Sequence, residues 1–533
     1  MLIGDALRRS SNVYPDKIAV IDKFGKYFPM DFKYNYRELY ETVNRLANGL
    51  LSLGLTKGDR IAILSDSRMG YAVSYLASVK AGLVFSPINP ALLQDEVAYL
   101  IQDSGARAFI VDADLFQKTI QGIRLRLNTV KYLIGMGEGH GCPYDWGTLI
   151  RDNPPTEPQV RLVDDDLATL IYTSGPTGIP KGVPLTHRNW SYSAYMFSAE
   201  QQLRHHWKWL MVLPLYTSGG TGHITAAAFR GCTLVLSDPE PGKILKIIQD
   251  EKIDFLPASP TVMARVVKHP GIKKYDLSSV KIWFTSAAPI SAELMKEISK
   301  YFGGKFIQTF GTSETALPGL ILQPEDVSVE GLLSRRLTSV GKAELGCEIK
   351  VVDDEGNEVQ PGGVGELLIR GDGVAEAYWN KPEAPDFKDG WWHSGDLVKV
   401  DEDGYIYVVD RKKDMILSGG LKIYSREVED VISTHPGVLL VSVIGVPDDE
   451  WGESVKAVIV PKEGVQITEA EIIGYCKARL ASYKKPRSVD FVSLSDMPLM
   501  GGGYKVLKRE LRDRYRRKYE EEKGKKIERW GVV

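Results

Sequence analysis

The sequence has 533 residues, 43% of them hydrophobic and 26% charged, so its composition is that of an ordinary globular protein, and its length exceeds what one hydrophobic core normally supports. With 67 basic and 69 acidic residues the formal net charge is -2, which gives no whole-protein attraction for nucleic acid. No stretch reaches the roughly 18 uncharged apolar residues that span a bilayer, and the amino terminus lacks a signal peptide's features, so we expect a cytoplasmic protein.

The chain up to about residue 160 alternates helical and strand patterns, which is typical of layered α/β structure. Residues 36–55, YRELYETVNRLANGLLSLGL, have helical periodicity. The short apolar runs RIAILS (60–65) and ARAFIVDA (106–113) end in turn signals and predict strands.

The same alternation of helical and strand patterns continues from Asp164 to about Glu314. Most of its apolar runs are followed by glycine or proline, and we predict that they form buried strands. These runs are LATLIYTS (167–174), WLMVLPL (209–215), CTLVLS (232–237) and VKIWFTS (280–286).

A loop rich in Gly, Ser and Thr, YTSGPTGIPKGV (172–183), follows the first of these runs. Such a loop exposes backbone N–H groups and hydroxyls, and Lys181 adds a positive charge suited to polyphosphate. The Walker A spacing is present, but Pro180 removes a donor and Gly182 replaces the hydroxyl that would bind magnesium. From the residues alone, a flexible surface turn is an equal alternative.

Between about residues 339 and 410 the sequence pattern changes to short strands separated by turns, and a further α/β segment follows. The polar cluster DRKKD (410–414) separates the two. We predict an α/β protein whose large domain spans residues 1–412, with a small β-barrel or curled sheet over about 336–410. A small α+β domain over 413–533 ends in a solvated, charged helix.

The loop and four further groups of residues resemble, in the same order, the signature motifs of the adenylate-forming (ANL) superfamily. The match covers the chain from about Leu167 to Arg512, and the overall plan resembles stand-alone fatty acyl-CoA synthetases. The other motif segments are SAAP (286–289), FGTSE (310–314), the pair around Asp396 and Arg411, and SGGLKIYSREVE (418–429) with YKVLKRELR (504–512).

The resemblance assigns the nucleotide to residues from these motifs. Phe310 would stack on adenine, Ser313 would reach the α-phosphate, and Glu314 and Thr173 would hold Mg²⁺. The implied ATP-binding residues are Thr173, Ser174, Gly175, Thr177, Gly178, Lys181, Ala287, Ala288, Phe310, Gly311, Thr312, Ser313, Glu314, Asp396, Arg411 and Lys505. Lys181, Glu314 and Lys505 are the implied catalytic residues. Asp396 would accept the ribose hydroxyls, and Arg411 would donate to ribose or phosphate oxygens.

The second half-reaction is implied to use a different face of the small domain. Lys413 falls at the family's hinge, about which this domain rotates between adenylation by Lys505 and thioester formation. Gly419, Gly420 and Lys422 would then line the coenzyme A path, although the glycines fit a tight turn equally well. The acyl pocket is expected at Tyr216, Thr217, Gly219 and Gly220.

Three residues depart from the family pattern: Pro176, Thr217 and Tyr504 stand where a hydroxyl, a histidine and a glycine are usual. The resemblance implies an acyl-CoA ligase that uses ATP, Mg²⁺ and coenzyme A on a medium- or long-chain fatty acid. An aryl-CoA ligase, an acyl-AMP ligase loading a carrier protein and a catalytically inactive nucleotide-binding protein remain alternatives. We expect no nucleic-acid partner, and homodimerisation and peripheral attachment to membranes stay open.

Overall fold

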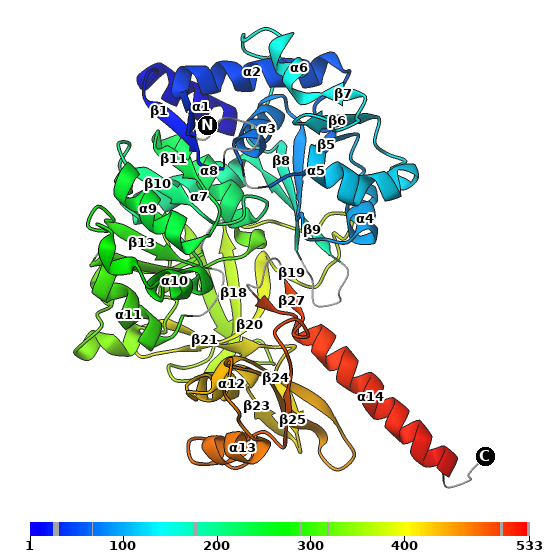
Figure 1. The fold of residues 1–533 in the computed structure, drawn as a ribbon, viewed down its shortest axis with the longest axis vertical. Coiled ribbons are helices and arrows are strands. Elements are labelled where there is room, and N and C mark those ends of the chain that lie inside the picture. The colour runs from blue at the N-terminus through cyan, green and yellow to red at the C-terminus, as the bar shows by residue number, and fades with distance from the viewer. Residues whose placement is uncertain are drawn as a thin grey trace. The chain divides into compact units, whose positions relative to one another are not determined.

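The computed structural model describes residues 1–24, 31–66, 68–173, 180–286, 290–303, 305–316, 319–500 and 505–529. It is an α/β protein, as predicted, and its contacts divide the chain into two compact units (Figure 1). The first unit comprises Met1–Lys350 and Leu368–His393, and the second comprises Val351–Leu367 and Ser394–Val533. Lys413 lies within the second unit, and the domain boundary at this residue stays a prediction.

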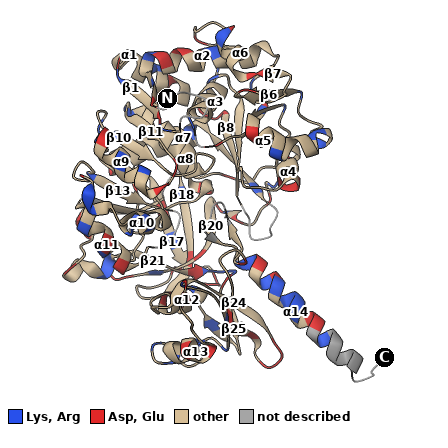
Figure 2. Ribbon diagram, in the orientation of Figure 1, with Lys and Arg blue, Asp and Glu red and all other residues tan. Residues whose placement is uncertain are grey.

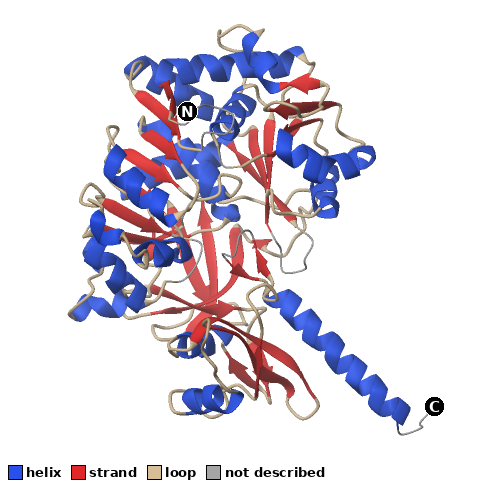
Figure 3. Cartoon of the chain, in the orientation of Figure 1, coloured by secondary structure: helices blue, strands red, loops and turns tan. Residues whose placement is uncertain are grey.

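The larger sheet of the first unit has nine strands in the order β16-β15-β14-β13-β12-β10-β11-β1-β2 (Figure 3). Its strands are β1 (Ile18–Asp22), β2 (Phe32–Asn35), β10 (Lys208–Met211), β11 (Thr233–Leu236), β12 (Phe255–Pro257), β13 (Ile282–Thr285), β14 (Lys305–Phe310), β15 (Leu320–Leu322) and β16 (Lys342–Ala343). The inner strands β1 and β10 to β14 run parallel. Parallel strands are usually covered on both faces, which explains why the sequence shows continuous apolar runs here.

The second sheet of this unit has seven strands in the order β7-β6-β5-β3-β4-β8-β9. Its strands are β3 (Arg60–Leu64), β4 (Val84–Ile88), β5 (Ala108–Asp112), β6 (Tyr132–Met136), β7 (Tyr144–Asp145), β8 (Leu167–Thr173) and β9 (Lys181–Thr186). Among its described residues, only the β8–β9 pair is antiparallel. The predicted phosphate loop therefore connects two neighbouring strands at the edge of this sheet.

The ends of helices in the first unit carry residues that favour helix capping. Asn35 caps α2 through a capping box with Glu38, and α8 ends at Gly231, whose φ is 78°. The main helices are α1 (Ile3–Val13), α2 (Tyr36–Ser52), α3 (Met69–Lys80), α4 (Gln94–Ser104), α6 (Trp146–Arg151), α7 (His187–Glu200), α8 (Ser218–Arg230), α9 (Pro241–Glu251), α10 (Pro260–Val267) and α11 (Ala292–Phe302).

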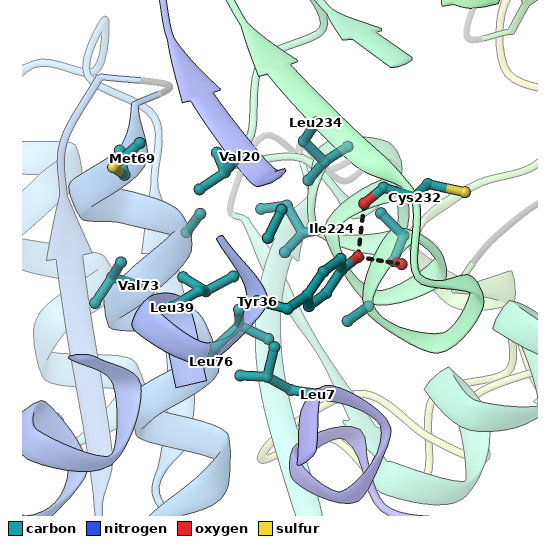
Figure 4. A pocket seen from close by; sticks show the side chains of 14 residues that line it. Leu7, Val20, Tyr36, Leu39, Met69, Val73, Leu76, Ile224, Cys232 and Leu234 are labelled. Carbon is teal, nitrogen blue, oxygen red and sulfur yellow. Dashed lines mark hydrogen bonds between the residues drawn. The ribbon is translucent and has the colours of Figure 1, made fainter. Parts of the chain in front are cut away.

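A small apolar cavity lies inside the first unit, lined by side chains from α1, α2, α3, α8, β1 and β11 (Figure 4). Its volume of about 20 Å³ is close to what one water molecule needs. The hydroxyl of Tyr36 beside it donates to the carbonyl oxygen of Cys232 at 2.6 Å. Because its lining is almost entirely aliphatic, we assign this cavity to the core and not to a ligand.

The strands predicted over residues 339–410 form one five-stranded sheet, in the order β17-β18-β20-β19 with β21 paired to β20. They are β17 (Cys347–Val352), β18 (Val364–Gly371), β19 (Phe387–Lys388), β20 (Trp391–Val400) and β21 (Ile406–Arg411). The chain passes from one unit to the other within β17, β18 and β20.

The rest of the second unit is a mostly antiparallel sheet with helices, as predicted. It contains β22 (Ile416–Ser418), β23 (Leu421–Ile423), α12 (Ser425–Ser433), β24 (Val438–Asp448), β25 (Gly452–Pro461), α13 (Glu469–Lys477), β26 (Ser488–Phe491), β27 (Leu499–Met500), β28 (Lys505–Val506) and α14 (Lys508–Arg529). The sheet order is β23-β22-β25-β24, with β26 parallel to β25.

Helix α14 carries Lys, Arg, Asp and Glu along its length, as the biased tail predicted (Figure 2). Its first turns are nonetheless anchored, because Leu511 is fully buried and the hydroxyl of Tyr515 donates to Asp490 at 2.6 Å. Among the described residues, no helix combines the length and apolar character that crossing a membrane requires.

Candidate functional site

The predicted phosphate loop is held at both ends by strand pairing. Thr173 ends β8, Lys181 begins β9, and the two residues are partners in the antiparallel register. Four predicted nucleotide ligands between them lie outside the described residues, namely Ser174, Gly175, Thr177 and Gly178. Strand pairing therefore places Thr173 and Lys181 beside each other at the base of the loop.

The base of this loop is anchored by contacts that the sequence analysis did not anticipate. The hydroxyl of Tyr172 donates to Asp103 at 2.6 Å. Burial is the larger cause, and the Asp103 carboxylate the second, of a raised pKa of Tyr172. A Cβ on Gly182 would lie 2.9 Å from Leu170 and 3.1 Å from the Cβ of Trp379. Any larger residue than glycine at position 182 would push these neighbours apart.

A chain of polar contacts links Lys181 to Glu314. The ammonium of Lys181 lies 3.0 Å from Asp386 and 4.4 Å from the centre of the Tyr378 ring. The hydroxyl of Tyr378 in turn donates to Oε1 of Glu314 at 2.9 Å. The predicted phosphate ligand and the predicted metal ligand are thus positioned by two residues that no motif had indicated.

Burial and the neighbouring carboxylate of Glu314 raise the pKa of Tyr378 well above its usual value. The phenol therefore keeps its proton and acts as a donor to Glu314 at neutral pH. The Glu314 side chain is buried, with 6% of its surface exposed. Its orientation is consequently fixed by Tyr378 and by its place in the short 3₁₀ turn Ser313–Thr315.

The oxygen donors around Glu314 fit a hard cation such as Mg²⁺. Strand β8, which ends at Thr173, contacts the 3₁₀ turn that carries Glu314. A carboxylate and a hydroxyl are the protein oxygens expected when phosphates and water complete the coordination. Mg²⁺ held there would supply positive charge to the phosphates of ATP.

The FGTSE segment continues from the end of β14. Phe310 is the last residue of that strand, and its carbonyl accepts from Gly319 at 2.9 Å. Gly311 and Thr312 follow, and the backbone N–H of Thr312 donates to Thr315 at 3.0 Å. The predicted adenine contacts Ala287 and Ala288 lie outside the described residues.

The predicted acyl-pocket residues lie at the start of α8. Thr217 caps this helix by accepting from Gly220 at 3.1 Å, and Tyr216 precedes it. Ser218 lies 3.4 Å from Ser313, measured between the hydroxyl oxygens, so the positive end of the α8 dipole adjoins the FGTSE segment. The capping role explains how Thr217 is tolerated where the family pattern has histidine.

The two glycines of this segment differ in their surroundings. A Cβ on Gly220 would lie 2.3 Å from the carbonyl oxygen of Pro214, so a side chain there would clash with backbone. The corresponding atom on Gly219 would meet, among the described residues, only Thr217 at 3.8 Å. Gly219 therefore leaves open space beside the first turn of α8.

One turn after Gly219, helix α8 packs against a group of aromatic rings, which we call the aromatic enclosure (Phe197, Trp209, Phe255 and Phe284). All four side chains are essentially inaccessible to solvent. They surround His223, one turn after Gly219, with ring centres 5.1 to 6.2 Å from the imidazole. The first turns of α8 thus pack against a buried aromatic cluster.

Replacing Tyr378 by phenylalanine tests the link between the two predicted ligands. The ring beneath Lys181 is kept, but Glu314 loses its donor, and a hydrogen bond to a charged group contributes about 1.5–3 kcal/mol. We expect adenylation to require several-fold more Mg²⁺, measured as pyrophosphate release over a magnesium titration. Trp379→Phe, which changes the neighbouring aromatic residue, is the control. Identical magnesium curves for Tyr378→Phe and the wild type would show that Tyr378 does not position Glu314.

The second unit carries its own group of predicted nucleotide ligands. Asp396 and Arg411 are register partners on β20 and β21, and Nε of Arg411 lies 3.1 Å from Oδ1 of Asp396. Asp396 is buried, whereas 38% of the Arg411 side chain is exposed. The guanidinium can therefore contact a ligand while it stays paired with the carboxylate.

Lys413 lies in a tight turn that follows β21. The backbone N–H of Lys412 donates to Gly395 at 2.8 Å, and those of Asp414 and Met415 donate to Arg411 at 2.8 and 3.0 Å. Burial, together with nearby Arg411, lowers the pKa of the Lys413 ammonium. The hydrogen bonds of this turn are thus donated by the backbone N–H groups of the residues next to Lys413.

The predicted hinge is tested by Lys413→Pro. Proline removes none of the three N–H donors, but it fixes φ near -65° and restricts Lys412 before it, so we expect one orientation of the rotating segment to be favoured. Adenylation should be kept, while thioester formation should fall by roughly tenfold or more, because the second step needs the other orientation. The measurement compares single-turnover adenylate formation with coenzyme A-dependent decay of the bound adenylate. Lys413→Ala is the control, and wild-type rates in both steps for the proline variant would refute the hinge.

The predicted coenzyme A residues form a hairpin turn. Gly419 and Gly420 connect β22 to β23 with φ values of 58° and 80°, which a two-residue turn with positive φ requires. A Cβ on Gly419 would lie 2.5 Å from the indole of Trp451, whereas none of the described atoms lies within 4 Å of one on Gly420. Lys422 is paired with Asp354 at 2.8 Å. The glycines therefore serve the turn, and both are exposed to solvent.

Lys505 begins β28, and its backbone pairs with Met500 on β27. Its side chain, like the whole of Tyr504, lies outside the described part of the chain. The catalytic role of Lys505 stays a prediction.

A protein-family model described as "AMP-binding enzyme" matches residues 7–379, and its C-terminal domain model matches residues 427–503. The chain is 36% identical over 486 residues to a feruloyl-CoA synthase of Amycolatopsis sp, covering 90% of this chain and 94% of the relative. It is 31% identical over 522 residues to the long-chain-fatty-acid–CoA ligase FadD13 of Mycobacterium tuberculosis, with 96% and 98% covered. A crystal structure of the anthranilate CoA ligase AuaEII in complex with anthranoyl-AMP superposes with a TM-score of 0.86 at 27% identity, covering 97% of both chains.

Proposed function

The chain belongs to the AMP-binding enzyme family and is an AMP-forming acid-thiol ligase, and on this premise we propose that the acid it activates is aromatic. Like its family, it uses ATP with Mg²⁺ and coenzyme A. The carboxylate attacks the α-phosphate of ATP and releases pyrophosphate. The thiol of coenzyme A then attacks the acyl carbon of the adenylate and releases AMP.

The aromatic enclosure carries the proposal for the acid. An acid whose carboxylate lies near Ser218 and Ser313 would extend beside Gly219 toward His223. His223 is five residues beyond Ser218, which is about 7.5 Å along the helix at 1.5 Å per residue. A flat ring suits so short a distance, and edge or face contacts with Phe197 and Phe284 would stabilise it.

For the adenylation step we propose that the described residues act by position and charge. Lys181 and the α8 terminus would offset the negative charge of the phosphates and carboxylate, because phosphoryl chemistry depends mainly on electrostatic stabilisation. Glu314, held by Tyr378, would bind Mg²⁺ with Thr173. Asp396 and Arg411 would bind the ribose, and Lys505 would bridge carboxylate and α-phosphate. Gly420 would line the coenzyme A path.

A medium- or long-chain fatty acid is the second candidate, which the overall plan of the sequence had favoured. The 31% identity to the M. tuberculosis long-chain-fatty-acid–CoA ligase supports it. The higher identity of 36% to the feruloyl-CoA synthase, together with the buried aromatic rings one turn beyond Gly219, favours the aromatic acid.

Pyrophosphate release over a panel of acids, with and without coenzyme A, tests the proposal. The panel contains benzoic, phenylacetic and cinnamic acids, their ring-hydroxylated forms, and octanoic and palmitic acids. We expect the best aromatic acid to exceed both fatty acids by about tenfold or more in kcat/KM, a difference of about 1.4 kcal/mol in transition-state binding. A fatty acid as the best substrate would overturn the aromatic proposal and leave the ligase assignment intact.

A further inference from the structure

Four residues in the first turns of α14 share one side of the helix, because their spacing is i, i+3, i+4 and i+7. They are Lys508, Leu511, Arg512 and Tyr515. The two apolar members are buried in a cluster against which Val506 also packs. Val506 follows Lys505 in β28. The short strand that carries Lys505 is therefore attached to the same apolar cluster as α14.

The two cations of this side of α14 bind carboxylates in different places. The ammonium of Lys508 lies 2.8 Å from Glu429 of α12. The guanidinium of Arg512 lies 2.6 Å from Oδ1 of Asp414, the residue after Lys413, and the two paired residues are 98 positions apart in sequence. Arg512 thus ties α14 directly to the turn that contains the predicted hinge.

The pair of Asp414 and Arg512 is largely shielded from solvent, with 11% and 26% of the two side chains exposed. Burial acts to raise the pKa of Asp414, but the hydrogen bond from Arg512 and the charge of Lys508 outweigh it, and the pKa is lowered. Asp414 is therefore ionised at neutral pH. Its attraction to Arg512 is screened less than the attraction within an exposed surface pair.

The turn that Arg512 contacts is also connected to the predicted nucleotide ligands of the second unit. The backbone N–H of Asp414 donates to the carbonyl oxygen of Arg411 at 2.8 Å. Arg411 is in turn paired with Asp396 at 3.1 Å. A continuous path of contacts therefore runs from α14 to the two residues proposed to bind the ribose.

Resting on the proposed role of Lys505 in adenylation, we infer that Arg512 is a positioning residue that sets Lys505 relative to the bound nucleotide. Only Val506 and Leu507 separate Lys505 from α14. A rotation at Lys413 would move Asp414 directly, and Arg512 would pass this movement on to the segment that carries Lys505. Such positioning matters because a displacement of about 1 Å can cost about 100-fold in rate.

Arg512→Ala tests this role through a difference between the two half-reactions. We expect single-turnover adenylate formation at saturating ATP to fall by about 10- to 100-fold, because Lys505 is kept but misplaced. The ATP concentration for the half-maximal rate should change by less than about twofold, since Asp396 and Arg411 are intact. Coenzyme A-dependent decay of a supplied acyl adenylate should stay near the wild-type rate. Equal losses in both steps would make Arg512 merely structural and overturn the inference.

Further variants separate the ion pair from general effects on folding. Arg512→Lys keeps the charge and should recover part of the adenylation rate, and Asp414→Asn should give the same difference between the half-reactions as Arg512→Ala. Arg509→Ala is the matched control, because Arg509 is a half-exposed cation of the same helix whose partner, Asp513 at 3.5 Å, also belongs to α14. It should leave both steps unchanged. Normal adenylation in Asp414→Asn would exclude the ion pair as the positioning contact.

A double variant shows whether Arg512 acts through Lys505. Added to Lys505→Ala, the change Arg512→Ala should lower adenylation by less than about twofold more, because residues that act as a unit are not additive. A further loss as large as that in the wild-type background would overturn the inference, while the role of Lys505 stands. Normal adenylation in Lys505→Ala alone would instead refute the proposed role of Lys505, and the inference with it.

Discussion

Replacing Lys505 by alanine should reduce adenylation by two to three orders of magnitude, on the scale of about 3–4 kcal/mol for a lost charge-stabilising donor. The reacting carboxylate and the α-phosphate are both anionic, so their approach needs a positive charge between them. The motif YKVLKRELR places Lys505 in this role by resemblance, and its backbone begins β28. The measurement is single-turnover pyrophosphate release with a saturating acid.

Thioester formation from a supplied acyl adenylate distinguishes a catalytic role for Lys505 from a structural one. This second step should proceed in Lys505→Ala at a rate close to that of the wild type, because the adenylate is already formed. Lys477→Ala removes an exposed positive charge from the same unit and should leave both steps unchanged. Equal losses in both steps for Lys505→Ala would show that the lysine is structural.

Replacing Glu314 by glutamine should reduce adenylation by roughly 100-fold at low magnesium and by less as the magnesium concentration is raised. The amide keeps the shape of the side chain and can still accept from Tyr378, which donates to Oε1 at 2.9 Å in the native protein. What is lost is the negative charge that binds a hard cation. Initial rates over a magnesium titration report the shift.

Glu344→Gln provides a matched control for Glu314→Gln. Glu344 lies in the same unit and is similarly buried, with 5% of its surface exposed. Burial, with the nearby charge of Glu200, raises the pKa of Glu344 well above its usual value, which favours its neutral form. Its magnesium dependence should equal that of the wild type. If Glu314→Gln behaved in the same way, Glu314 would not be a metal ligand.

Secondary structure and family could be predicted from the sequence because their signals are local. Apolar runs such as CTLVLS and VKIWFTS became β11 and β13, and the helical pattern after Asn35 became α2. The motif segments identified the family because each one places its chemistry in a few adjacent residues. The paired glycines were also interpreted correctly in part, since a tight turn was one of two interpretations of Gly419 and Gly420.

The contacts that position the site could not be predicted in this way. Lys181 meets Asp386 across 205 residues of sequence, and Tyr378 meets Glu314 across 64. Asp386 and Tyr378 lie outside every motif, and the residues next to them in sequence do not indicate these partners. Only the folding of distant strands and loops onto one another brings them together.

By itself, then, the sequence determined the α/β class, several of the strands and helices and, through the resemblance of its motifs to a family, the type of reaction, because each depends on periodicity or on compact motifs. The tertiary structure alone decided which side chains position Lys181 and Glu314. Asp386 and Tyr378 do so because the fold brings them within hydrogen-bonding distance of these two residues. Hydrogen-bond satisfaction is a property of the folded environment, which is why only the tertiary structure reveals it.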